Sequence, residues 1–141
     1  MNFYDYLTKQ KETRNLFHII DDVPNDIVKK CKYIVDELEI DPGLVFIDLE
    51  IAAIDKDYSK LEEDLVRLVE QKKSNTNNMC NILNKDIIED ERLIEKFSGQ
   101  TDVDTTGYID FLEKHKKETE TEYKYLSFLL TRHIDWLREN S

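Results

Sequence analysis

The sequence predicts an all-α protein, a single-domain bundle of about five helices over residues 1–141, and three observations support this prediction. The 141 residues include three glycines and two prolines, too few for the tight turns of most all-β folds. Apolar residues recur at spacings of three and four wherever they cluster, which is the period of a helix with one buried face. The 40% hydrophobic content is enough to form a core in a chain of this length.

The first forty residues predict two helices. The first extends from Asn2 to about Ile20, with apolar residues near both ends and a polar middle. An acidic break with Pro24 follows, and proline is favoured in the first turn of a helix. The second helix ends near Ile40 and carries the wide apolar stripe of a core-facing helix: Ile27, Val28, Cys31, Ile34, Val35 and Leu38.

A long helix is predicted from about 43 to 73, because no glycine or proline occurs between Leu44 and Gly99. A heptad pattern extends along it: Leu44, Ile47, Ile51, Ile54, Tyr58, Leu61, Leu65 and Leu68. Its first half has a second apolar face, which predicts packed neighbours on both sides: Val45, Phe46, Leu49, Ala52 and Ala53. A short strand over 47–51, where apolar and acidic residues alternate, is the alternative for this part.

The remaining residues predict one loop and two more helices. The polar residues from Lys72 to Asn78 predict the loop, because Ser, Thr and Asn side chains compete for backbone hydrogen bonds. The next helix ends at Ser98-Gly99, and the last extends from about 108 to 139. The polar run 113–122 within the last helix is either a solvated turn of helix or a local break.

Neither a targeting segment nor a membrane helix is recognisable in the sequence. The N-terminal residues lack the basic and apolar regions of a signal peptide, and the longest apolar run, 44–54, contains Asp48 and Glu50. We therefore expect a cytosolic protein that does not enter a membrane, with Cys31 and Cys80 as reduced core thiols. The excess of lysine over arginine and the scarcity of alanine are typical of an AT-rich genome, such as that of a low-GC bacterium, a phage or a large DNA virus.

The common catalytic signatures of helical proteins are missing. No histidine has a glutamate three residues before it, which excludes the di-iron motif of helical bundles. The two cysteines and three histidines do not have the spacing of zinc ligands, and no serine lies in a nucleophile-elbow sequence. The sequence therefore predicts a protein that is not an enzyme.

Residues 102–113 have oxygen-bearing groups at the spacing of a calcium loop. The candidate ligands occupy positions 1, 3, 5, 7, 9 and 12: Asp102, Asp104, Thr106, Tyr108 (through its carbonyl), Asp110 and Glu113. Gly107 occupies position 6, where the loop turns sharply. These twelve residues resemble the EF-hand family, and the resemblance implies calcium as a cofactor. The alternative is a helix N-terminal cap, in which Asp102, Asp104 and a neighbouring threonine satisfy free backbone N–H groups.

Six carboxylates flank the heptad pattern of the long predicted helix: Asp48, Glu50, Asp55, Asp57, Glu62 and Asp64. In a self-contained bundle, such flanking positions usually carry charges of both signs. The acidic residues therefore predict a docking surface for a basic protein, such as a nuclease, a toxin or a nucleic-acid-binding protein, with a solvated helix face as the alternative. The net charge of −11 argues against direct binding of nucleic acid, because phosphate is repelled.

Together these patterns predict a non-catalytic acidic interaction protein of the inhibitor or immunity type, with a phage or virus among its candidate sources. Two alternatives stay open. One is a calcium-binding regulatory module built on residues 102–113. The other is a helical-bundle subunit that pairs with a second copy through its heptad pattern to form a homodimer.

Overall fold

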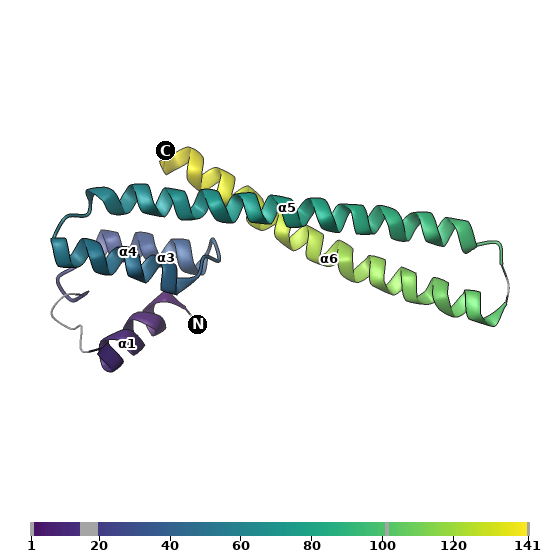
Figure 1. Ribbon diagram of the computed structural model, residues 1–141, viewed down its shortest axis with the longest axis horizontal. Coiled ribbons are helices and arrows are strands. Elements are labelled where there is room, and N and C mark those ends of the chain that lie inside the picture. The colour runs from purple at the N-terminus through teal and green to yellow at the C-terminus, as the bar shows by residue number, and fades with distance from the viewer. Residues whose placement is uncertain (1, 15–19, 101, 141) are drawn as a thin grey trace. The chain divides into compact units, whose positions relative to one another are not determined.

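The computed structural model describes residues 2–14, 20–100 and 102–140, and it confirms the predicted all-α class. Over these ranges the chain forms five labelled helices and no strand (Figure 1). They are α1 (Phe3–Arg14), α3 (Asn25–Asp36), α4 (Pro42–Asp55), α5 (Ser59–Phe97) and α6 (Val103–Asn140). None of these helices is long and apolar enough to cross a membrane. The strand alternative for residues 47–51 is wrong, because they lie within α4.

The chain divides into two compact units, each described by itself. Unit 1 comprises residues 1–73 and 132–141, and unit 2 comprises residues 74–131. Both α5 and α6 contribute residues to each unit. The single-domain organisation expected from the sequence stays a prediction.

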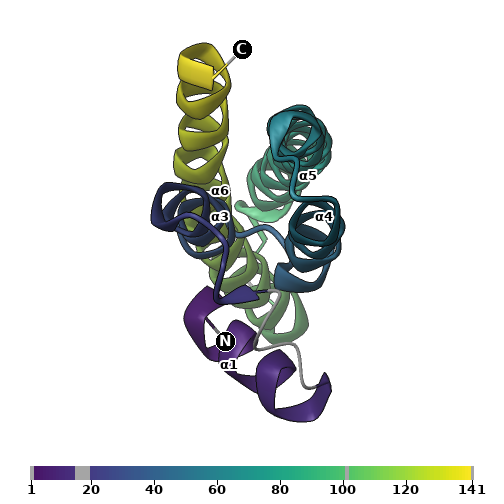
Figure 2. The same ribbon diagram turned by 90° about the vertical axis from the view of Figure 1, so that its left-hand side faces the viewer.

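Unit 1 contains a core to which every helix contributes. Within this unit α1 contacts both α3 and α4, and Figure 2 shows α3 and α4 nearly end-on with α1 below them. The periodicity of α3 explains its orientation, because the apolar stripe predicted from sequence is the face that it buries. The largest fully buried side chains of this core are Phe3, Ile34, Leu38, Phe46, Leu49, Leu61 and Leu65.

The last turns of α6 are fixed to unit 1 by two polar contacts with the segment that follows α3. His133 is completely buried, and its Nε2 lies 2.9 Å from the carbonyl oxygen of Leu38. The Arg132 guanidinium binds the Glu37 carboxylate at 2.8 Å. His133 is therefore a structural residue of this core.

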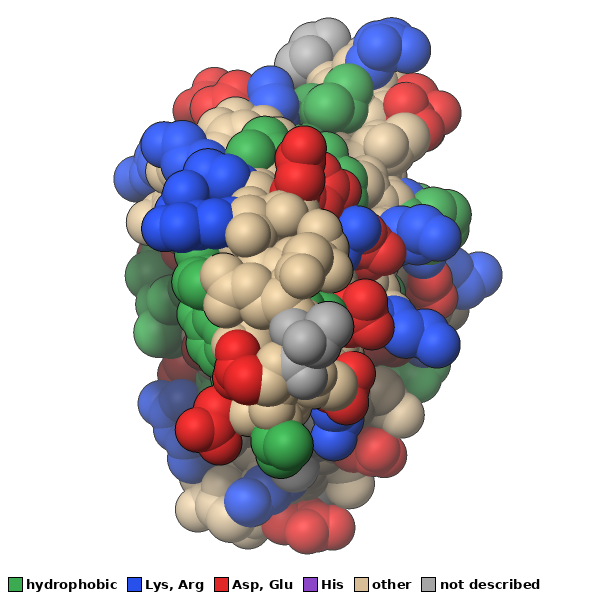
Figure 3. Space-filling model, turned by 90° about the vertical axis from the view of Figure 1, so that its right-hand side faces the viewer, with side chains coloured by type: hydrophobic (Ala, Val, Ile, Leu, Met, Phe, Trp, Pro, Cys, Tyr) green, Lys and Arg blue, Asp and Glu red, His purple; other side chains and the backbone are tan. Residues whose placement is uncertain are grey.

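Unit 2 is formed by the second part of α5 and the first part of α6. The side chains buried in this unit continue the helical spacing on both segments: Thr76, Cys80, Leu83, Ile87, Asp90, Leu112, Thr119 and Leu129. His115 binds the buried Asp90 carboxylate at 2.6 Å, which joins the two helices by an ion pair when the ring is protonated. Acidic and basic side chains are interspersed on the face that Figure 3 shows.

The predicted helix from 43 to 73 is wrong, because the chain turns between α4 and α5. Lys56 adopts a left-handed conformation with φ of 54°. The N–H groups of Lys56 and Asp57 bond to the carbonyls of Ala53 and Ala52, which is the Schellman pattern of helix ends. Asp57 Oδ1 then accepts hydrogen bonds from the Ser59 N–H at 3.1 Å and the Ser59 hydroxyl at 2.7 Å, at the start of α5.

Further boundaries differ from the sequence prediction, and one of them is the end of the second helix, which lies at Asp36 rather than near Ile40. The loop predicted from Lys72 to Asn78 is helical and belongs to α5, because buried Thr76 and Cys80 continue the spacing of buried Leu65 and Val69. The last helix begins at Val103 rather than near residue 108, and its polar run is an uninterrupted part of α6. The first helix ends at Arg14, and its expected extension to Ile20 crosses residues 15–19, which lie outside the described residues.

Candidate functional site

Helix α4 has two apolar faces, of which the structure buries one. Val45, Phe46, Leu49, Ala52 and Ala53 lie in the core of unit 1. The opposite face consists of Leu44, Ile47, Ile51 and Ile54, which are 48%, 53%, 55% and 57% exposed, respectively. We call these four residues the aliphatic stripe. The sequence prediction of packed neighbours on both sides of α4 is therefore wrong within unit 1, because the four members of the heptad pattern that belong to α4 lie at the surface.

A pocket lies beside the aliphatic stripe, between α4 and the beginning of α5. Its volume is about 300 Å³, and Ile51 belongs both to its wall and to the stripe. Four of the six carboxylates predicted to bind a partner line this pocket: Asp48, Asp55, Asp57 and Asp64. Lys60 and Arg67 line it as well, and neither was among the predicted site residues. The spacing Asp64–Arg67 was a signal for Arg67, because it places the cation one helical turn after an acid. We call this cavity the acidic pocket.

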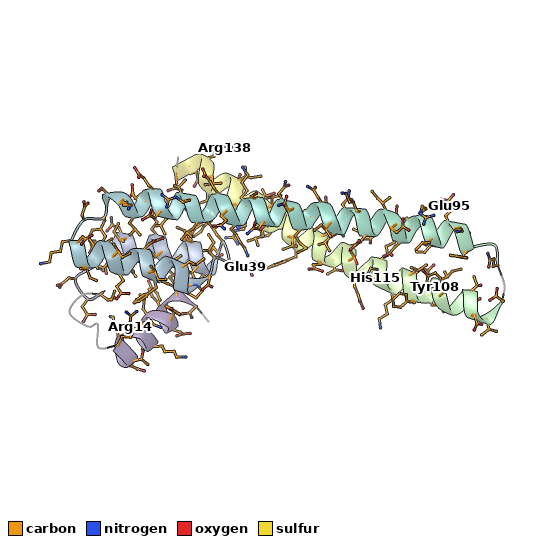
Figure 4. The ribbon with its side chains drawn as sticks, viewed as in Figure 1. Arg14, Glu39, Glu95, Tyr108, His115 and Arg138 are labelled. Atoms are coloured by element: carbon orange, nitrogen blue, oxygen red, sulfur yellow. The ribbon has the colours of Figure 1, made fainter. Side chains whose placement is uncertain are left out.

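The other two predicted acids take part in the packing of unit 1. Glu50 forms two hydrogen bonds with the Arg14 guanidinium, at 3.0 and 3.2 Å, and thereby connects α4 to the end of α1. Figure 4 labels Arg14 at this end of α1. Glu62 lies 3.5 Å from the Lys30 ammonium on α3. These two carboxylates are already paired with cations of the same chain.

Within the acidic pocket, the acids are neutralised unequally. Asp64 forms an ion pair with Arg67 at 3.3 Å, and Asp57 is bound to Ser59. Over the described ranges, neither Asp48 nor Asp55 forms an ion pair. Partial burial raises the pKa of Asp48, the negative charge of Asp64 raises it further, and Arg67 and Lys60 oppose the rise. The ionised form of Asp48 is therefore less stable in the folded chain than in water, and an approaching cation would stabilise it.

Residues 102–113 do not form a calcium loop in the structure. Asp102 caps α6, where its Oδ1 accepts a hydrogen bond from the Thr105 N–H at 2.8 Å and its Oδ2 accepts one from the Thr105 hydroxyl at 2.7 Å. The residues that follow are helical, so side chains spaced by two residues point to different sides of α6. The hydrogen bonds of Asp102 are those of a helix N-terminal cap, and the residues after it are helical in this structure.

The predicted calcium ligands therefore do not converge. In the part of the chain that the structure describes, no group of three or more acidic, histidine or cysteine side chains is placed to hold a metal ion. Calcium binding by Asp102, Asp104, Thr106, Tyr108, Asp110 and Glu113 stays a prediction that requires the first turns of α6 to unwind.

Replacing Asp102 with alanine should lower the melting temperature of the protein by a few degrees, because both hydrogen bonds at the start of α6 are lost. Glu113→Gln is the matched control and should leave the melting temperature unchanged. Thermal denaturation followed by circular dichroism, with and without calcium, measures both effects. A calcium-dependent rise in melting temperature that Glu113→Gln abolishes would instead establish a calcium loop.

Comparison with known proteins finds no family model that matches this chain, no curated protein with a similar sequence and no solved structure that it matches.

Proposed function

We propose that this chain is a non-catalytic interaction protein of the inhibitor or immunity type, which binds a basic protein at the acidic pocket and the aliphatic stripe. The observation that supports the proposal is the position of Asp48 and Asp55. These two carboxylates form no ion pair among the described residues, and they lie beside aliphatic side chains that are about half exposed.

The aliphatic stripe favours a binding surface over a solvated helix face. Single exposed apolar residues are normal on protein surfaces, whereas contiguous patches mark interaction sites. Here four aliphatic residues occupy one face of a single helix, with carboxylates at its edge. Protein interfaces combine an apolar centre with a polar rim in the same way.

The charge of the site favours a basic partner. Carboxylates that are not neutralised within the chain attract cations over about 8 Å at physiological ionic strength. Such attraction raises the rate of association with a basic protein and disfavours acidic competitors. A partner of this kind is expected to be a nuclease, a toxin or a nucleic-acid-binding protein, whose own basic surface is directed at phosphate.

Asp48→Asn/Asp55→Asn should weaken binding of the basic partner at least tenfold, mainly through slower association. The control Glu63→Gln/Glu70→Gln removes the same charge from exposed positions of α5 outside the acidic pocket. The partner is identified by affinity capture from the native host, and its rate constants are then measured by surface plasmon resonance at several salt concentrations. Equal losses in both variants would place the binding site elsewhere.

Asp48→Asn should also raise the melting temperature slightly at neutral pH. Because the folded-state pKa of Asp48 lies above its unfolded value, the ionised side chain destabilises the folded chain above that pKa. The amide cannot ionise, so its advantage should disappear as the pH falls below the ordinary aspartate pKa of about 3.9. Thermal denaturation across this pH range measures the effect. Lower stability of Asp48→Asn at neutral pH would contradict the raised pKa.

A further inference from the structure

We infer that the partner element bound here is a basic amphipathic α-helix, which packs its apolar face on the aliphatic stripe and inserts a cationic side chain into the acidic pocket. This inference rests on the proposed function, because it names the part of the basic protein that the site recognises.

The spacing of the aliphatic stripe matches a helix. Its residues recur at intervals of three, four and three along α4, so they form a straight row on one face. With a rise of about 1.5 Å per residue, this row is about 15 Å long. A partner helix with apolar residues at the same intervals can contact all four members of the row. A bound strand exposes every second residue on one face and cannot follow this spacing.

The charges beside the aliphatic stripe select a basic helix. Asp48 and Asp55 are seven residues apart and therefore lie on the same side of the stripe, two helical turns from each other. Cations at a spacing of seven on the partner helix would face both of them. On the other side of the stripe, Arg14 already neutralises Glu50. The carboxylates without a cation therefore lie on the pocket side.

The acidic pocket has an excess of negative charge that one or two cations would balance. Its four carboxylates face the two cations Lys60 and Arg67, which leaves a formal charge of −2. The cavity of about 300 Å³ opens beside Ile51, so a residue at the edge of the bound helix can reach it while its neighbours contact the aliphatic stripe. A long arginine or lysine side chain fits this requirement, because its stem is apolar and its head is charged.

A second copy of this chain fits the aliphatic stripe less well. If two α4 helices paired in parallel, Asp55 would lie opposite Glu50 of the other copy, whose charge Arg14 already balances. If they paired antiparallel, Asp48 and Asp55 would lie opposite the same carboxylates. The antiparallel arrangement places like charges together, and the parallel one brings no cation to Asp48 or Asp55, so self-association at neutral pH is disfavoured.

Three synthetic helical peptides of about 18 residues, or five turns, test the inference against the full chain by fluorescence anisotropy. The first peptide has leucines at the spacing of the aliphatic stripe, with lysine or arginine on both sides of its row of leucines. The second keeps the cations but replaces the leucines with alanine, and the third keeps the leucines but carries glutamate. We expect the first peptide to bind at least tenfold more tightly than either of the others.

Variants of the protein locate the bound peptide. Ile47→Ser/Ile51→Ser should weaken binding of the first peptide at least tenfold, and these exposed positions should tolerate serine without loss of helical circular dichroism. Ile82→Ser is the matched control, because Ile82 is 53% exposed on α5 in unit 2. Asp48→Asn/Asp55→Asn should reduce binding of the first peptide and lessen its dependence on salt.

The outcomes separate the helix inference from the proposed function. If both cationic peptides bind equally, or if Ile47→Ser/Ile51→Ser has no effect, the helix inference is wrong, whereas the acidic site for a basic protein stands. If no peptide binds but the captured partner still requires Asp48 and Asp55, the helix inference is again wrong and the acidic site for a basic protein again stands. If neither peptide nor partner depends on these acids, both proposals are wrong. A dimer in analytical ultracentrifugation that Ile51→Ser dissociates would assign the stripe to a second copy and overturn the inference.

Discussion

Phe46→Ala should lower the free energy of unfolding by about 3–5 kcal/mol, because truncating a buried phenylalanine leaves a cavity in the core. The Phe46 side chain is 1% exposed and packs edge-on against the Tyr6 ring, with centroids 5.7 Å apart. The Arg14 guanidinium lies 5.9 Å from the Phe46 ring centroid, so the contact between α1 and α4 weakens as well. Chemical denaturation followed by circular dichroism gives the value.

The neighbouring residue Ile47 provides the control for this substitution. Ile47→Ala removes apolar atoms from the same helix, but on the exposed face, and should cost less than about 1 kcal/mol. The two results together would show that the folding of unit 1 depends on one face of α4. A cost for Ile47→Ala close to that of Phe46→Ala would mean that the aliphatic stripe is part of the core, and it would remove the basis for a binding surface.

His133→Ala should lower the free energy of unfolding by about 2–4 kcal/mol, because it creates a cavity and leaves the Leu38 carbonyl without its donor. The ring donates from Nε2 to this carbonyl, and its Nδ1 has no partner among the described residues, as fits a neutral imidazole. Asn140→Ala is the control on the same helix. The Asn140 amide donates a hydrogen bond to the Trp136 carbonyl one turn earlier, and its loss should cost less than about 1 kcal/mol. Denaturant titration of both variants measures the difference.

The stability of unit 1 should also fall as the pH is lowered. Burial lowers the pKa of His133 below its ordinary value of 6.5, and the charge of Lys72 lowers it further. The unfolded chain therefore takes up a proton before the folded chain does, and stability is lost as the pH falls below 6.5. His133→Gln should remove this part of the pH dependence, as measured by melting temperatures between about pH 7.5 and pH 5.

His115 in unit 2 should have the opposite effect. The hydrogen bond that His115 Nδ1 donates to the Asp90 carboxylate raises the pKa of His115, and the negative charge of Asp90 adds to the rise. The contribution of the His115–Asp90 pair to the free energy of unfolding is complete below pH 6.5. It is lost as the pH rises through the folded-state pKa of His115. Hydrogen exchange of amides in each unit separates the two effects, with His115→Asn as the reference for unit 2. Parallel pH responses in the two units would contradict this assignment of the histidines.

The sequence predicted helices well where their ends carry ordinary signals. Pro24 precedes α3, Asp41 caps α4 and Pro42 begins it, and Ser98-Gly99 follows α5 close to its expected end. The break after Asp55 was missed because the left-handed residue there is Lys56, whereas helices usually end on glycine or asparagine at this position. Asp57 before Ser59 was the remaining signal, and it is weak because acidic residues are frequent throughout this chain.

Part of the site was predicted from the sequence, but the long helix on which that prediction was based is not present in the structure. The six acids were identified from one continuous heptad pattern, which the turn at Lys56 interrupts. Four of them still share the acidic pocket, because a short connection keeps the end of α4 close to the start of α5. Which apolar face of α4 would be exposed could not be predicted, since both faces have helical spacing. The decision depends on the contacts that α4 makes with helices distant in the sequence.

Folding constrains the amino acids on the buried face of α4, whereas it leaves those on the exposed face free to change. Substitutions of Val45, Phe46 or Leu49 alter the core, whereas substitutions in the aliphatic stripe alter a surface that folding does not require. Specificity can therefore diverge at the stripe without passing through unfolded variants. A library randomised over residues 44–55 and selected for folding should retain the first set of positions, and one selected for binding should retain both.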